Sequence, residues 1–242
     1  MDLLEKALTT FTITHIAQSL NLATGTIKRW IQLKSVPTAY RFDLMRLIGE
    51  EINYADFSHK DKDQFFTNSN TAKYCIEKAQ EIIKTLETLE NLNEYFYIEP
   101  SAGEGSFLNL LPIKKRIGLD IEPKTEEIIC GDYLTWYPEL KKYIVIGNPP
   151  FGLRGHLALK FINHSFKFAN FVCFILPQLF ESDGKGSPRK RVVGFNLLHS
   201  EKLKTGFYYT GGKSVVVNCI FQIWSKHHKN PQYDIKNQYQ KL

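Results

Sequence analysis

The chain has 242 residues, with 31 Lys and Arg against 25 Asp and Glu, a formal net charge of +6 and an isoelectric point near 9.0. Hydrophobic residues make up 43% of the chain and charged residues 23%, which excludes a collagen-like, mucin-like or largely disordered protein. The length allows one full-size domain and a small one. The basic balance is compatible with an anionic partner such as nucleic acid.

The charge is unevenly distributed along the chain. Residues 1–60 hold 7 basic and 6 acidic residues, residues 61–140 hold 8 and 15, and residues 141–242 hold 16 and 4. An acidic middle part is therefore followed by a strongly basic final part.

The cysteines and the apolar segments indicate the compartment. The four cysteines are far apart and form no CxxC pair: Cys75, Cys130, Cys173 and Cys219. We therefore predict no metal site and an intracellular, reducing compartment, either the cytoplasm or the nucleoid or nucleus. The N-terminus lacks the apolar region of a signal peptide, and runs such as Phe171–Leu176 are too short to span a bilayer, so we expect no membrane partner.

Residues 1–58 are predicted to form a separate small helical domain. A short helix with apolar residues Ile16 and Leu20 is followed by a tight turn and a second helix with apolar residues Ile27 and Trp30. This arrangement is typical of a helix-turn-helix unit.

In such a unit the second helix would present Thr26, Lys28 and Arg29 to DNA. The alternative is a small helical bundle that packs on the rest of the protein and binds nothing. The net charge of residues 1–60 is only +1, which counts against a strong independent DNA binder.

Residues 59–242 are predicted to form an α/β domain. Apolar residues three or four positions apart predict one long helix over residues 70–92. Short apolar strands then alternate with turns and helices, which predicts a sheet with buried parallel strands. The predicted strands are Tyr95–Ile98, Arg116–Leu119, Glu127–Cys130, Tyr143–Gly147, Phe171–Leu176, Lys202–Tyr209 and Val215–Trp224.

A glycine-containing loop, Glu99-Pro-Ser-Ala-Gly-Glu-Gly-Ser-Phe107, follows the first of these strands. Gly103 and Gly105 would let the backbone turn tightly and approach a ligand closely. A dinucleotide-binding fingerprint would require a third glycine where this chain has Leu108, so NAD binding is disfavoured.

Two further acids follow successive strands. Asp120 comes 21 residues after Glu99, where a carboxylate can accept hydrogen bonds from ribose hydroxyls. Asp132 is followed by Tyr133 and could accept a bond from an exocyclic amine while apolar neighbours contact a purine. Each acid alone could equally be a helix cap, but acids at three successive strand ends favour a ligand site.

The fourth strand leads into Asn148-Pro-Pro-Phe151. The two prolines fix the backbone and remove N–H donors, so carbonyl groups face whatever lies at the strand end. An ordinary turn is the alternative, because Asn-Pro is a common turn signal. The three preceding sites favour the functional interpretation.

In this order the motifs resemble those of the S-adenosylmethionine-dependent amino-methyltransferases, especially the gamma-order N6-adenine DNA methyltransferases. Phe65–Ala72 resembles the upstream cofactor motif, and the resemblance covers about residues 62–225. The chain departs from the family pattern at Asn68 (usually Pro), Glu99 (usually Asp) and Phe151 (more often Tyr).

The resemblance implies a Rossmann-like class I methyltransferase domain with a seven-stranded mixed sheet, preceded by the helix-turn-helix-like domain. It implies S-adenosylmethionine as cofactor and no metal. The implied cofactor-binding residues are Thr67, Glu99, Pro100, Gly103, Gly105, Asp120, Ile121, Asp132, Tyr133 and Asn148. The implied catalytic residues are Asn148, Pro149, Pro150 and Phe151.

The expected chemistry explains the tetrapeptide. An exocyclic adenine amine is a poor nucleophile, and the Asn148 side-chain oxygen with the Pro149 carbonyl would hold both of its N–H groups. The transfer is an in-line displacement that depends on positioning. Phe151 would stack on the target base once that base has left the duplex.

The basic segment Glu181–Arg191 concerns the substrate. Its cationic residues would contact phosphates or simply belong to a solvated loop, and we weigh these equally. These residues are Lys185, Arg189, Lys190 and Arg191. Only 91 residues follow Phe151, so we expect target selection to come from the N-terminal domain, this segment or a partner subunit.

The sequence therefore predicts an enzyme that methylates the N6 amine of adenine in DNA. The alternatives are methylation of adenine in RNA or of a glutamine side-chain amide, which also present a planar conjugated NH2 group, and a catalytically inactive DNA-binding subunit. The basic final part favours nucleic acid over protein.

Overall fold

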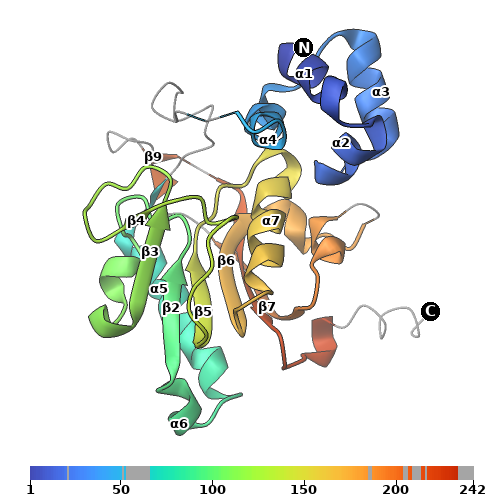
Figure 1. Cartoon of the computed structure of the whole chain (residues 1–242). Helices are drawn as coiled ribbons and strands as arrows, with labels where there is room; N and C mark the ends of the chain where they lie inside the picture. Colours follow the sequence, from blue (N-terminus) through green and yellow to red (C-terminus); the bar gives the residue numbers. More distant parts are fainter. Residues whose placement is uncertain are drawn as a thin grey trace, which may run out of the picture. The chain divides into compact units, whose positions relative to one another are not determined.

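A computed structural model describes residues 1–20, 22–50, 52, 66–184, 187–203, 207–208, 214–215 and 217–233 (Figure 1). The chain divides into two compact units, Met1–Lys62 and Asp63–Leu242. The boundary predicted between residues 58 and 59 lies outside the described residues.

The first unit is helical. Its α-helices are α1 (Asp2–Thr10), α2 (Ile13–Ser19), α3 (Thr24–Leu33) and α4 (Arg41–Leu47). The Thr12 hydroxyl caps α2 by accepting a hydrogen bond from the His15 backbone N–H at 3.2 Å. One apolar core joins all four helices, and the Trp30 and Tyr40 rings lie 4.8 Å apart within it.

Helix α3 has a buried face and an exposed face. Ile27 and Trp30 are buried in the core, whereas Lys28 and Arg29 are exposed and Thr26 is half-buried. The apolar spacing therefore predicted the orientation of this helix correctly. A contact of its exposed side chains with DNA stays a prediction.

The second unit contains a seven-stranded sheet in the order β4-β3-β2-β5-β6-β10-β7 (Figure 1). Its strands are β2 (Tyr95–Glu99), β3 (Arg116–Asp120), β4 (Ile129–Cys130), β5 (Lys142–Gly147), β6 (Phe171–Pro177), β7 (Asn196–Leu203) and β10 (Cys219–Ser225). Strands β2 to β6 are parallel, and β10 runs antiparallel to both β6 and β7. The seven-stranded mixed sheet implied by the resemblance is confirmed.

Apolar residues cover both faces of this sheet, as buried parallel strands require. In β6, Cys173 and Ile175 pack in a cluster with α5 (Ser69–Lys84), while their neighbours on the opposite face pack with α7 (His156–Ser165). The two helices lie on opposite faces in Figure 1. A continuous apolar strand therefore serves two cores at once, because successive side chains point to opposite faces.

A smaller sheet has the order β1-β8-β9. Its strands are β1 (Phe66–Thr67), β8 (Phe207–Tyr208) and β9 (Ser214–Val215), and β8 is antiparallel to both neighbours. It thus joins a segment that precedes the large sheet in the chain to one near its end.

The helix predicted over residues 70–92 is divided into α5 and α6 (Leu89–Leu92). The Thr88 hydroxyl accepts a hydrogen bond from the Asn91 backbone N–H at 3.3 Å and so starts α6 separately. Leu89 is exposed, so the apolar spacing extended the prediction too far.

No helix in the described part of the chain combines the length and hydrophobicity needed to cross a membrane.

Three predicted strands have different bounds. The prediction Glu127–Cys130 shortens to β4. The prediction Lys202–Tyr209 covers only the end of β7, which begins at Asn196, and all of β8. Strand β7 pairs with β10 along its whole length, and this pairing sets its limits. The prediction Val215–Trp224 divides between β9 and β10.

We expect Phe221→Ala to lower the free energy of unfolding by about 3–5 kcal/mol. The Phe221 ring of β10 is fully buried in the core between the sheet and α5. Urea unfolding measures this change. The control Leu140→Ala alters a fully exposed side chain and should change stability by less than about 0.5 kcal/mol. Equal effects of the two substitutions would contradict the assigned core.

Candidate functional site

The predicted site residues gather at the carboxyl ends of β2, β3 and β5. Strand β2 pairs with β3 on one side and with β5 on the other, so the strand order reverses between β2 and β5. Ligands of open α/β sheets bind at such a reversal. Glu99 ends β2, Asp120 ends β3, and Asn148 follows the end of β5.

The glycine loop has the conformation that its sequence predicted. Gly103 and Gly105 have φ angles of +52° and +80°, which favour glycine. A Cβ atom on Gly103 would lie 3.0 Å from the Phe66 ring, and one on Gly105 would lie 2.9 Å from the Asn109 side chain. The loop backbone therefore lies close against its neighbours in a way that larger residues would prevent.

Glu99 is buried and shapes this loop. Its carboxyl oxygens accept hydrogen bonds from the backbone N–H groups of Leu108 at 2.6 Å and Phe107 at 3.4 Å. Burial, helped by the nearby charge of Asp120, raises the pKa of Glu99 to about 8 although these two hydrogen bonds lower it. Glu99 thus holds the loop through backbone contacts, and a direct cofactor contact stays a prediction.

Asp120 ties the loop to β3. Its carboxylate accepts hydrogen bonds from the backbone N–H groups of Gly103 at 2.7 Å and Glu122 at 2.8 Å. Each carboxylate oxygen keeps further acceptor capacity, which suits ligand hydroxyls. Pro100 is buried at the start of the loop, and Ile121 is half-buried beyond β3.

Asp132 and Tyr133 have different environments. The Asp132 carboxylate accepts a hydrogen bond from the Leu134 backbone N–H at 3.0 Å, which stabilises the turn after β4. The Tyr133 ring is buried, stacks on Phe161 at 5.1 Å, and its hydroxyl lies 2.7 Å from the Ser165 hydroxyl. The Tyr133 side chain therefore joins the turn after β4 to α7, and a cofactor contact of this residue stays a prediction.

The tetrapeptide contains an unpaired acceptor. The Asn148 Oδ1 atom is buried and has no hydrogen-bond partner within the structure as described. Such an atom is costly in a folded protein and calls for an explanation. Pro149 is buried, Pro150 is half-buried, and the Phe151 ring belongs to the core on the α5 side of the sheet. Base stacking by Phe151 stays a prediction.

Thr67 on β1 carries a second such atom. Its side chain is buried, and its hydroxyl has no hydrogen-bond partner among the described residues. Its neighbour Phe66 touches the glycine loop at Gly103, so β1 lies against that loop. Phe65, at the start of the predicted upstream motif, lies outside the described residues.

Two contacts of the loop were not predicted. The Ser101 hydroxyl donates a hydrogen bond to the Asn148 backbone carbonyl at 3.1 Å. Tyr208 stacks on Phe66 at 5.7 Å and donates a hydrogen bond to the Glu104 carboxylate at 3.2 Å. Both join residues far apart in the chain, and no local sequence pattern indicates such pairs.

The basic segment is only partly available to a ligand. The buried Arg189 guanidinium pairs with Asp183 at 2.9 Å and donates to the Tyr233 carbonyl at 3.1 Å, so it holds local structure instead of extending toward phosphate. Lys190 is exposed and Arg191 is half-buried. Lys185 lies outside the described residues.

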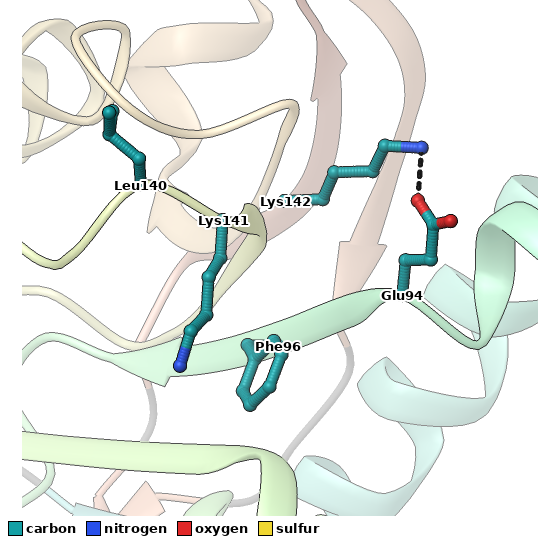
Figure 2. A pocket seen from close by; sticks show the side chains of 5 residues that line it. All are labelled: Glu94, Phe96, Leu140, Lys141 and Lys142. Atoms are coloured by element: carbon teal, nitrogen blue, oxygen red, sulfur yellow. Dashed lines mark ion pairs between the residues drawn. The ribbon is translucent and has the colours of Figure 1, made fainter.

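A hollow of about 400 Å³ lies elsewhere, at the amino ends of β2 and β5 (Figure 2). Lys142 pairs there with Glu94 at 2.6 Å, and the Lys141 Nζ atom lies 4.4 Å from the centre of the Phe96 ring. It is at the opposite end of these strands from Asn148. The described residues contain no group of three or more His, Cys, Asp or Glu side chains suited to a metal ion.

The raised pKa of Glu99 predicts a pH dependence of stability. The folded carboxyl, with a pKa near 8, keeps a proton that the unfolded chain loses near 4.5, so this contribution to stability decreases as the pH rises between these values. Urea unfolding at several pH values should show a decline in the wild type that Glu99→Gln reduces. The control Glu90→Gln alters an exposed carboxyl and should keep the decline. Identical profiles for wild type and Glu99→Gln would contradict the assignment.

No protein-family model matches the sequence, and no curated protein matches it. The chain does resemble solved structures. An assigned RNA methyltransferase from Pyrococcus horikoshii has a TM-score of 0.50 at 20% identity, over 68% of this chain and 87% of its own. A modification subunit assigned to a type I restriction enzyme from Vibrio vulnificus YJ016 has a TM-score of 0.46 at 12% identity, over 78% of this chain and 53% of its own.

Magnesium protoporphyrin IX methyltransferase from Synechocystis PCC 6803, solved with bound S-adenosylmethionine, has a TM-score of 0.44 at 11% identity, over 79% of this chain and 98% of its own. The chain thus spans about half the length of the Vibrio subunit and most of the other two proteins. The strand order and the likeness to the Pyrococcus protein agree on the fold. The second unit has the Rossmann-like α/β fold of the class I methyltransferases.

Proposed function

We propose that this protein transfers a methyl group from S-adenosylmethionine to the exocyclic N6 amine of adenine in DNA. The observation that carries the proposal is the buried and unpaired Asn148 Oδ1 atom, next to the reversal of strand order between β2 and β5. A donor on a ligand would satisfy this acceptor.

The residues around the glycine loop fit S-adenosylmethionine as the cofactor. The unpaired Thr67 hydroxyl lies on the strand beside the loop, and the Asp120 carboxylate has remaining capacity for ribose hydroxyls. Asp132 would accept a hydrogen bond from the adenine amine of the cofactor. When bound, the cofactor supplies an electrophilic methyl group on a positively charged sulfur.

The tetrapeptide would hold the amine that receives the methyl group. Asn148 Oδ1 and the Pro149 carbonyl accept hydrogen bonds from the two N–H groups of this amine and stabilise the positive charge that develops on its nitrogen. The nitrogen afterwards loses one proton to solvent. Because this chemistry depends on alignment more than on a general base, the restricted backbone of the two prolines suits it.

DNA is the proposed substrate because of charge. Residues 141–242 hold 16 basic and 4 acidic residues, and Lys190 is exposed within them. On the first unit, Lys28 and Arg29 are also exposed. Target selection would come from that unit, from the basic segment or from a partner subunit. The four free cysteines fit an intracellular, reducing compartment.

Methyl transfer from radiolabelled S-adenosylmethionine to DNA, RNA and protein tests the proposal. Label in DNA, located at N6 of adenine, is the expected result. Label only in RNA or only in protein would move the substrate to one of those classes. Absence of cofactor binding by calorimetry would instead indicate an inactive DNA-binding subunit.

We expect Asn148→Ala to reduce kcat by at least about 100-fold, because the amine loses its side-chain acceptor in the transition state. The dissociation constant of S-adenosylmethionine, measured by calorimetry, should stay within about twofold. Asn91→Ala serves as a control, since the Asn91 side chain bonds Glu87 and Lys142 near the amino ends of the strands. Full turnover by Asn148→Ala would refute the amine-holding role.

We expect Lys28→Ala and Arg29→Ala each to weaken DNA binding at low salt and to reduce the slope of log affinity against log salt by about one. Fluorescence anisotropy with duplex DNA at several salt concentrations measures both quantities. Lys73→Ala, on the exposed surface of α5, is the charge-matched control. If the control and the two variants behave alike, α3 is not a DNA contact.

A further inference from the structure

We propose that Ser101 is a positioning residue for methyl transfer, because its hydroxyl fixes the peptide group that lies between the two amine acceptors, the Asn148 side chain and the Pro149 carbonyl. This inference rests on the proposed function and gives a role to a residue of the glycine loop that was not among the predicted site residues. Its basis is the hydrogen bond of 3.1 Å from the Ser101 hydroxyl to the Asn148 carbonyl.

The Asn148–Pro149 peptide group has only one polar atom that can form a hydrogen bond. Proline carries no N–H, so this peptide plane offers its carbonyl oxygen and no donor. The Ser101 hydroxyl donates a hydrogen bond to that oxygen. Fixing the plane limits the rotations that aim the Asn148 side chain before it and the Pro149 carbonyl after it.

The other partner in this hydrogen bond is held just as firmly. Ser101 is flanked by the buried Pro100 and by Ala102, whose backbone N–H donates to the Leu119 carbonyl of β3 at 2.8 Å. One residue further on, Gly103 donates to Asp120. Ser101 therefore belongs to a segment bound at two points to the neighbouring strand.

At the same place, Gly147 at the end of β5 lies against the side chains of Glu99 and Pro100. A Cβ atom on Gly147 would lie 3.3 Å from the Glu99 side chain and 3.5 Å from the Pro100 ring. The Ser101 hydrogen bond thus directly connects the loop proposed to hold the methyl donor with the tetrapeptide proposed to hold the amine.

The consequence for the reaction is a fixed distance between the two reactants. An in-line displacement tolerates little misalignment, and a shift of about 1 Å costs roughly 100-fold in rate. Loss of the Ser101 bond should therefore lower kcat while both ligands still bind, since Ser101 is not assigned to the contacts that bind them.

The test compares Ser101→Ala, Ser101→Thr and Thr85→Ala with the wild type. Thr85→Ala is the matched control, because it removes a hydroxyl-to-carbonyl bond of 2.7 Å to Ile82 at the far end of α5. We measure kcat and KM for DNA, the calorimetric dissociation constant of S-adenosylmethionine, and the melting temperature.

We expect Ser101→Ala to lower kcat by about 10- to 100-fold, with the cofactor dissociation constant and KM within about threefold of the wild type. Ser101→Thr keeps the hydroxyl and should recover most of the rate. Thr85→Ala should leave kcat unchanged.

Two results would overturn the role of Ser101 while the proposed function stands: normal kcat in Ser101→Ala, or a loss of cofactor affinity that accounts for the whole loss of rate. An inactive wild type on DNA, RNA and protein would instead overturn the proposed function, and the role of Ser101 with it.

Discussion

The pairing of β2 with β5 is the constraint on which the candidate site depends. These strands are far apart in the chain, yet their parallel register puts the glycine loop beside the tetrapeptide. At the end of β5, a Cβ atom on Gly147 would lie only 3.3 Å from the Glu99 side chain, so there is little room for a larger residue. The hydrogen bond from the Ser101 hydroxyl to the Asn148 carbonyl depends on this placement.

Much of this arrangement could be predicted from the sequence because its signals are local. The apolar runs fixed the central strands to within one or two residues, and the chain carries glycine where positive φ angles are needed at Gly103 and Gly105. The orientation of α3 also followed from the spacing of Ile27 and Trp30. In each case the residue type at a position, together with its near neighbours in the sequence, determines the local conformation or burial.

The predictions that failed depend on distant partners. The start of β7 is set by its pairing with β10. The burial of Arg189 was likewise not predicted, because its partners, Asp183 and the Tyr233 carbonyl, are not indicated by the basic run. The sequence marked Arg189 as a cation in a basic run, but burial and pairing give it a structural role. The same limit explains why Ser101 was missed, since nothing beside it indicates a hydrogen bond to Asn148.

The small sheet also has a consequence for how the protein is made. Phe66, which rests on the glycine loop at Gly103, pairs with Tyr208 of β8. Bringing such distant segments together costs chain entropy that local contacts cannot offset early in folding. During synthesis the ribosome releases Phe66 long before Tyr208. The pairing of Phe66 with Tyr208 can therefore form only when most of the chain has emerged. A nascent or truncated chain that lacks β8 has the glycine loop sequence without this contact.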